Sequence, residues 1–184
     1  MDPHLERLEQ EIATAISGFQ TEQLNWHRPG KWCVAEILEH LYLTYAGTIK
    51  GCGRLLERGK PLASKATLKN VAQSFIVVRL GYMPTGRKSP EVARPRGLPA
   101  EKISSEIVST IREMDSLLSQ CAATFGVSLK VMDHPILGPF SVAQWRKFHL
   151  VHGLHHAKQI RGLREQVRAG NLQAAAVENE NAGV

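Results

Sequence analysis

The chain has 184 residues, of which 43% are hydrophobic; this suits one domain with a buried core and excludes a disordered chain. Its net charge is +6, and part of the excess lies between Arg79 and Lys102, in a segment broken by prolines and glycines. This segment shows neither a regular alternation of basic and aromatic residues nor a helix-turn-helix or finger spacing, so nucleic acid is not expected as a partner.

Four segments carry hydrophobic residues at steps of three and four, which place them on one face of a helix. The first two are Leu5–Phe19 and Val34–Leu55. The third is Ile103–Cys121, and the fourth is Ser141–Val167, which opens with a Ser-x-x-Gln capping box. Because the alternation typical of a strand is sustained nowhere, the sequence predicts an all-α fold, a four-helix bundle.

The connection between the second and third helices, about residues 58–98, is too long for a simple bundle turn. Within it, residues 68–80 are predicted to form a short extra helix, whereas residues 82–98 hold too many prolines and glycines for a regular one. The basic residues of this loop suit either a solvated surface or contact with an anionic small molecule. We expect the bundle domain to span residues 1–168 and residues 169–184 to form a frayed polar tail.

The cysteines indicate a reducing compartment. There are three of them, Cys33, Cys52 and Cys121, and no two form a C-x-x-C pair, so no disulfide is predicted. The apolar run Phe75–Val78 is far too short to span a membrane, and no secretory signal is visible at the start of the sequence. The sequence therefore predicts a cytoplasmic protein that does not act on a membrane.

The fourth segment carries histidines at positions where a helix bundle normally places leucine. His152 and His156 are four residues apart, so both rings leave one face of the helix and can reach a single divalent ion. A third ligand must come from another helix, and His40 lies about two turns into the second segment. These three histidines are the candidate metal ligands, and three neutral imidazoles leave a coordination position open for water or substrate.

Other interpretations of the histidines stay open at this stage. A histidine in a helical core is most often a hydrogen-bonded polar residue and not a ligand. The His-Glu-x-x-His motif of zinc proteases and the Glu-x-x-His pairs of di-iron bundles are both absent. His149 is expected to support the site or hold a water, while His155 is expected to point away from it. Glu36 is expected mainly to cap its helix, and Gln159 is a candidate for orienting a bound water.

Two segments resemble motifs of the DinB/YfiT-like superfamily. They are Trp32–Leu41, with the sequence WCVAEILEHL, and His149–Ile160, with the sequence HLVHGLHHAKQI. The resemblance covers nearly the whole chain in helix order. Members of this superfamily are four-helix bundles whose metal is bound by one histidine of the second helix and an H-x-x-x-H of the last, which here implies the same three histidines. One departure is Cys33, where relatives usually have a serine that caps the helix.

The resemblance implies metal-dependent chemistry without selecting one reaction. Characterised members include transferases and isomerases that use low-molecular-weight thiols such as bacillithiol or mycothiol, and hydrolase-like proteins. For this chain it implies a divalent metal, zinc or nickel first and iron or manganese next, and favours a thiol S-transferase acting on a small-molecule substrate. The alternatives are a metal-dependent hydrolase and a metal- or ligand-binding bundle without catalysis, and a homodimer is left open.

Overall fold

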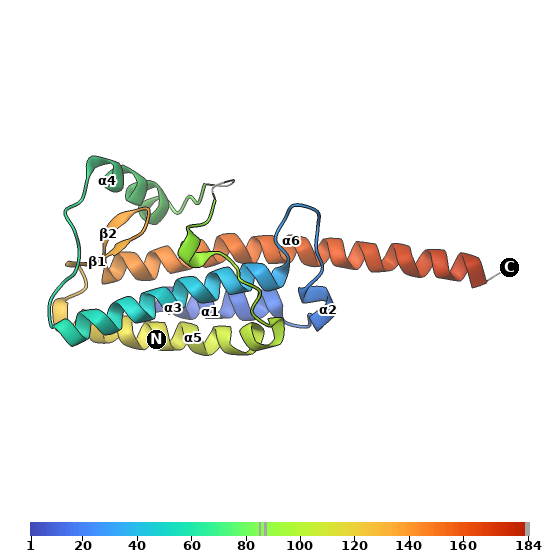
Figure 1. Cartoon of the computed structure of the whole chain (residues 1–184), viewed down its shortest axis with the longest axis horizontal. Coiled ribbons are helices and arrows are strands. Elements are labelled where there is room, and N and C mark those ends of the chain that lie inside the picture. Colours follow the sequence, from blue (N-terminus) through green and yellow to red (C-terminus); the bar gives the residue numbers. More distant parts are fainter. Residues whose placement is uncertain (85, 87, 183–184) are drawn as a thin grey trace.

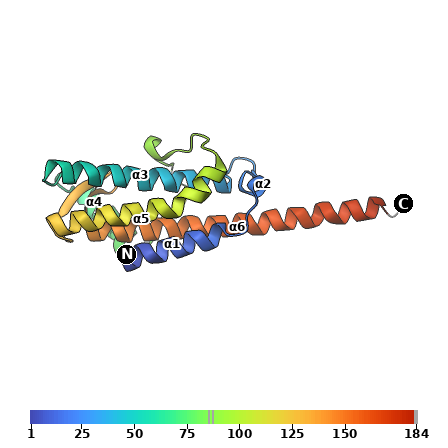
Figure 2. The same cartoon turned by 90° about the horizontal axis from the view of Figure 1, so that it is seen from below.

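The computed structural model describes residues 1–84, 86 and 88–182, and the side chains among them up to residue 169. Four helices lie side by side and form the body of the protein: α1 (Pro3–Ile16), α3 (Val34–Arg58), α5 (Ala100–Phe125) and α6 (Val142–Ala182). Helix α3 packs mainly against α5 and α1 mainly against α6, while α5 also contacts α1 and α6 (Figures 1 and 2). The predicted helical class is confirmed, and one core lies between the four helices.

The smaller elements lie in the connections. Helix α2 (Thr21–Leu24) precedes α3, and α4 (Leu68–Ser74) continues into a π-helical turn at Phe75–Arg79, so the extra helix predicted at residues 68–80 is confirmed. The loop that follows contains, in its described residues, a short 3₁₀ turn at Glu91–Ala93. It returns along α3, and Figure 1 shows this green segment crossing α3 before α5 begins.

A short antiparallel hairpin was not predicted. It consists of β1 (Lys130–His134) and β2 (Gly138–Ser141), with an irregular register next to Lys130. Buried and exposed residues do not alternate along β1 and β2, so the sequence shows no alternation of apolar and polar residues that would predict a strand. Gly138 has a φ of +75°, and a Cβ at this position would stand 2.5 Å from the Cγ of Asn70, so both the turn and the packing against α4 require glycine.

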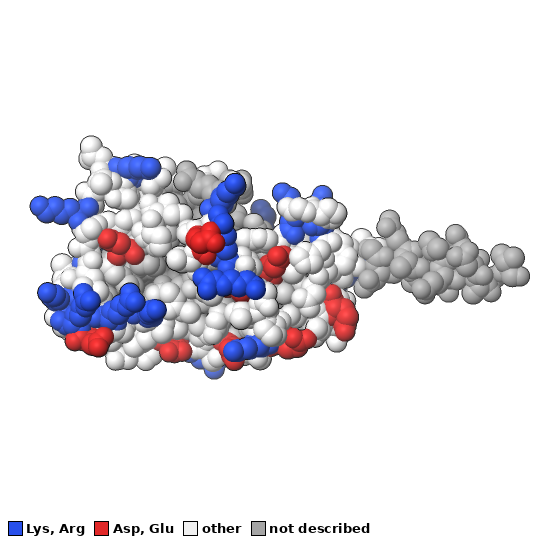
Figure 3. Space-filling model, viewed as in Figure 1, with Lys and Arg blue, Asp and Glu red and all other residues white. Residues whose placement is uncertain are grey.

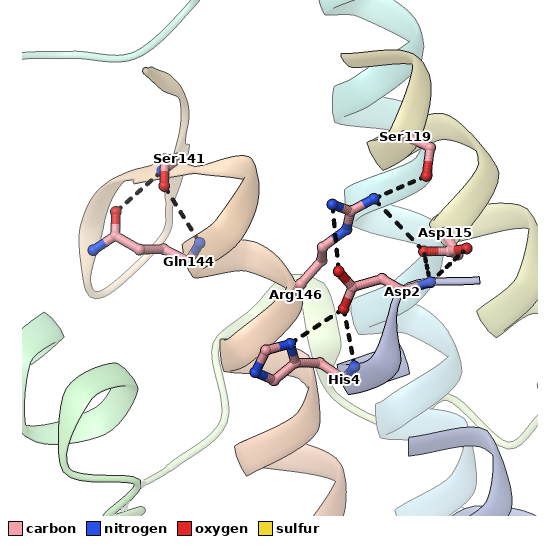
Figure 4. A network of polar contacts seen from close by, with 7 residues as sticks. All are labelled: Asp2, His4, Asp115, Ser119, Ser141, Gln144 and Arg146. Atoms are coloured by element: carbon pink, nitrogen blue, oxygen red, sulfur yellow. Dashed lines mark hydrogen bonds and ion pairs between the residues drawn. The ribbon is translucent and has the colours of Figure 1, made fainter. Parts of the chain in front are cut away.

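Capping bonds fix where the two histidine-bearing helices begin. At the start of α6, the Ser141 amide donates to Gln144 Oε1 at 3.1 Å and the Gln144 amide donates to Ser141 Oγ at 3.3 Å, the capping box expected from the sequence (Figure 4). At the start of α3, the amide of Cys33 donates to Glu36 Oε2 at 2.8 Å. Glu36 therefore caps its helix as predicted, although a cysteine stands at the cap position.

Helix α6 turns its apolar stripe to the core as the sequence predicts. The buried positions expected there are Trp145, Ile160 and Leu163. The same stripe predicts that Arg146, Lys158 and Arg164, on the other side of the helix, face solvent. Lys158 is exposed, but the prediction is wrong for Arg146 and Arg164, because both are half-buried. Arg164 Nη2 donates at 2.7 Å to the carbonyls of both Ala15 and Ser17 and so satisfies acceptors at the end of α1.

Arg146 joins three helices at the other end of the bundle, and only 13% of its side chain is exposed. Its guanidinium donates to Ser119 Oγ at 2.8 Å, lies 3.5 Å from an Asp2 carboxylate oxygen and 3.9 Å from one of Asp115 (Figure 4). Asp2 also accepts from the amide of His4 at 2.9 Å and caps α1. The hydrophobic periodicity of the sequence cannot reveal such a network, because its members belong to three different helices.

Three further sequence predictions concern disulfides, membrane-spanning segments and the limit of the domain. Cys33, Cys52 and Cys121 are free and buried, so the absence of a disulfide among them is confirmed. No helix of the described residues combines the length and apolar character needed to cross a membrane. The domain limit at residue 168 stays a prediction. So does the frayed tail predicted for residues 169–184, although the described backbone belongs to α6 as far as Ala182.

Candidate metal centre

The three candidate ligands meet inside the protein, as the sequence predicts. His40 comes from α3, and His152 and His156 come from consecutive turns of α6. Nε2 of His152 lies 3.1 Å from Nε2 of His40 and 3.0 Å from Nε2 of His156. All three side chains are buried, and one donor atom from each lies within 4.8 Å of the others, close enough to hold a metal ion.

These separations fit coordination geometry. Imidazole nitrogens bind zinc at about 2.0–2.1 Å, and at tetrahedral angles two such nitrogens stand about 3.3 Å apart. The observed values of 3.0 and 3.1 Å are only slightly shorter. Three neutral imidazoles that carry their proton on Nδ1 cannot donate to one another through Nε2. A cation at the centre of the cluster would satisfy all three lone pairs at once.

In two of the rings, hydrogen bonds on the side away from the cluster favour the neutral form that carries its proton on Nδ1. Nδ1 of His40 lies 2.7 Å from the carbonyl oxygen of Ala93, and Nδ1 of His156 lies 2.8 Å from Oε1 of Gln159. Since an oxygen of this kind only accepts, each Nδ1 carries the proton and each Nε2 keeps its lone pair. Gln159 thus holds a histidine, where the sequence suggested that it orients a water. Nδ1 of His152 is buried and has no partner among the described residues.

Burial keeps the cluster uncharged. It is the main cause that lowers the pKa of His156 to about 3 and that of His152 well below its ordinary value, with repulsion from neighbouring histidines adding to the effect. The pKa of His40 is also lowered by burial, partly opposed by its bond to Ala93. All three are therefore neutral near neutral pH, which is the form of histidine that binds metals.

His149 lies one turn before His152 but takes no part in the cluster. Thr48 Oγ1 donates to the carbonyl of Thr44, so it accepts from His149 Nε2, which lies 3.0 Å away. The His149 ring is fully buried and stacks on Trp145, with ring centroids 5.6 Å apart. It is a buried core histidine, and the two roles expected for it, supporting the site or holding a water, stay predictions. His155 is half-buried and also stands outside the cluster.

Glu39, the residue before His40, was missed by the sequence reasoning. Its carboxylate is buried and accepts hydrogen bonds from the backbone amides of Arg96, Gly97 and Leu98. It thus ties the end of the long loop to α3. The available signal was an acidic residue that stands next to His40 between the apolar pairs of the helix, but its partners are backbone groups that no side-chain pattern reveals.

A cleft of about 1310 Å³ leads to the cluster. Its walls come from α3, α6, the hairpin and the long loop, and His40, His152 and His156 all line it. Basic side chains also line the cleft: Arg28, Lys31, Arg54, Lys88 and Arg94. On this face of the molecule, lysines and arginines gather in several groups with acidic residues between them (Figure 3). The cluster is therefore accessible from a cleft that is large enough for a small molecule and favours an anionic one.

A second group of possible ligands lies at the start of α3 and comprises His27, Cys33 and Glu36, also within 4.8 Å of one another. It is less suited to a metal. Glu36 is engaged with the amide of Cys33, and burial raises the pKa of the Cys33 thiol, which keeps it protonated. The three-histidine cluster is therefore the stronger candidate.

Fold and site together define a mostly helical protein with a buried cluster of three histidines at the base of a cleft. The chain belongs to the family described as a protein of unknown function, DUF1569, whose sequence pattern matches residues 2–162. That range contains all three histidines and the loop that covers them. No match is found among curated proteins or among solved structures.

Proposed function

We propose that His40, His152 and His156 bind one divalent metal ion and that the family is part of the DinB/YfiT-like superfamily, whose two motifs the sequence resembles. The main support is the convergence of three neutral Nε2 atoms from two helices: that of His152 lies 3.1 Å from the Nε2 of His40 and 3.0 Å from the Nε2 of His156. A donor set of three imidazoles suits zinc or nickel first and iron or manganese next.

The protein is further proposed to be a metal-dependent enzyme of the thiol S-transferase type that uses a low-molecular-weight thiol. Two observations support this: only three ligands are available among the described residues, and the cleft leads to them. A bound metal would supply a Lewis acid that lowers the pKa of a thiol. Lys31, Arg54 and Lys88 line the cleft and would attract carboxylates of the thiol or substrate, while Ile37 and Met83 would contact apolar parts. The three free thiols suit the cytoplasmic location that the sequence predicts.

The test is adduct formation between small thiols and chlorodinitrobenzene, which releases chloride as the thiol sulfur replaces it on the ring. The zinc- or nickel-loaded protein is expected to accelerate this reaction and to bind the thiol, and His152→Ala is expected to abolish both effects. Absence of thiol binding, or binding that survives His152→Ala unchanged, would reject the transferase proposal. Metal-dependent cleavage of an ester or amide probe would then favour the hydrolase, and neither activity would favour a bundle that only binds metal.

A further inference from the structure

A buried carboxylate holds one part of the long loop, residues 88–98, which we call the strap. Glu39 is 1% exposed, and its oxygens accept from the amides of Arg96 at 2.7 Å, Gly97 at 3.0 Å and Leu98 at 3.1 Å. In the described part of the chain no ion pair involves Glu39. Consecutive amides directed at one anion form a backbone anion site, so the strap itself is the partner of this charge.

An earlier part of the strap contacts the cluster. His40 follows Glu39 in α3, and its Nδ1 donates to the carbonyl of Ala93 at 2.7 Å, with Ser89 Oγ 3.3 Å from the same nitrogen. The Ala93 amide donates to the carbonyl of Pro90 at 3.0 Å, which closes the 3₁₀ turn that presents the Ala93 carbonyl. Two successive side chains of α3 therefore hold the same strap. Glu39 binds it through its carboxylate, and His40, a candidate metal ligand, binds it through Nδ1.

We propose that Glu39 is a positioning residue of the metal centre: it docks the strap, and the docked strap holds His40 in the form that binds metal. The inference rests on the metal site proposed above. Because coupling between two equilibria is reciprocal, the factor by which docking raises metal affinity is also the factor by which metal favours the docked strap. Removing a hydrogen-bond partner that orients a histidine ligand lowers metal affinity about 10–100-fold in other proteins.

The first arm of the test needs no metal. Trypsin can cut the Arg96–Gly97 bond, and the amides on both sides of this bond are held by Glu39. Glu39→Gln keeps the size of the side chain but removes its charge, so cleavage is expected to be about tenfold faster than in the unaltered protein. The matched control is Glu91→Gln, which removes a strap charge that is 81% exposed and pairs with Arg94 at the surface. Because exposed ion pairs contribute little, it is expected to leave the rate nearly unchanged.

The second arm measures zinc affinity by competition with a coloured chelator. Glu39→Gln is expected to weaken zinc binding about tenfold or more, and Glu91→Gln is expected to leave it unchanged. In the unaltered protein, zinc is expected to slow cleavage at Arg96–Gly97. Thermal melting establishes that each variant is folded, and Glu39→Asp, which keeps the charge but shortens its reach, replaces Glu39→Gln if the latter is unfolded.

The outcomes separate the two proposals. Cleavage of Glu39→Gln at the unaltered rate would show that Glu39 does not dock the strap, even if zinc binds. Faster cleavage with unchanged zinc affinity would overturn the coupling and leave the metal site intact. Failure of the unaltered protein to bind zinc would overturn the metal site and with it the coupling, while the metal-free cleavage arm would still report on the docking of the strap.

Discussion

Gly153 offers a sharp test of how α6 is placed. It lies between His152 and His156, where α6 packs against α1. A Cβ at this position would stand 2.0 Å from Leu8 Cδ1 and 3.5 Å from Tyr45 Oη. Leu8 and Tyr45 are both 0% exposed, so neither can turn out into solvent. The approach to Leu8 is far inside the ordinary carbon–carbon contact of about 3.5–4.0 Å, so Gly153→Ala must displace a core side chain or separate the helices.

The expected cost follows from two opposing effects. Overpacking a core costs about 1–3 kcal/mol, and an overlap this large belongs at the upper end of that range. Replacing glycine by alanine inside a helix contributes about 1 kcal/mol in the other direction. Gly153→Ala should therefore lose about 1–2 kcal/mol of stability in total. Gly162 is the matched control in the same helix: nothing lies within 4 Å of its added Cβ, so Gly162→Ala should gain about 0.5–1 kcal/mol.

Urea unfolding of the metal-free proteins, followed by circular dichroism, measures both changes. The result that supports the structure is a loss of stability for Gly153→Ala beside a gain for Gly162→Ala. If both variants gain stability equally, α1 does not pack against α6 at this turn. The rotation of α6 that brings His152 and His156 to His40 would then be wrong as well.

Two further predictions concern the core. Burial lowers the pKa of His134 to about 4 and that of His149 to about 3, below the ordinary histidine value of 6.5, so on acidification the unfolded chain takes up protons first. Stability without metal should be complete above pH 6.5 and fall as the pH decreases, by up to about 2 kcal/mol per histidine at pH 5; equal urea midpoints at neutral and acidic pH would contradict this. Cys33, Cys52 and Cys121 are buried, so a thiol reagent should label them only after unfolding, and rapid labelling of all three in the folded protein would refute that burial.

Much of the fold follows from periodicity. The spacing of three and four marks the helices because each buries one face, and the same reasoning places His152 and His156 together, since residues four apart share a face. His40 was placed with them because it is a histidine near the inner face of another long helix. The structure brings its Nε2 to within 3.1 Å of that of His152.

Features that depend on backbone groups or on distant charges were not predicted. Glu39 looks like an acid in an apolar run, and only the returning loop supplies the amides that bind it. Arg146 and Arg164 look like solvent-facing charges on α6, yet one pairs with carboxylates of other helices and the other binds carbonyls at the end of α1. Such partners come from tertiary structure, and no local pattern encodes them.

The central claim is that three histidines bind one metal ion, and zinc stoichiometry with X-ray absorption tests it most directly. The purified protein, stripped of metal and titrated with zinc, should bind one ion per chain with nitrogen ligands at about 2.0–2.1 Å. His27→Ala, which affects only the second group of possible ligands, should bind the same amount, whereas His152→Ala should bind none tightly. Absence of tight binding in the unaltered protein, retention of the ion in His152→Ala, or its loss in His27→Ala would contradict the account.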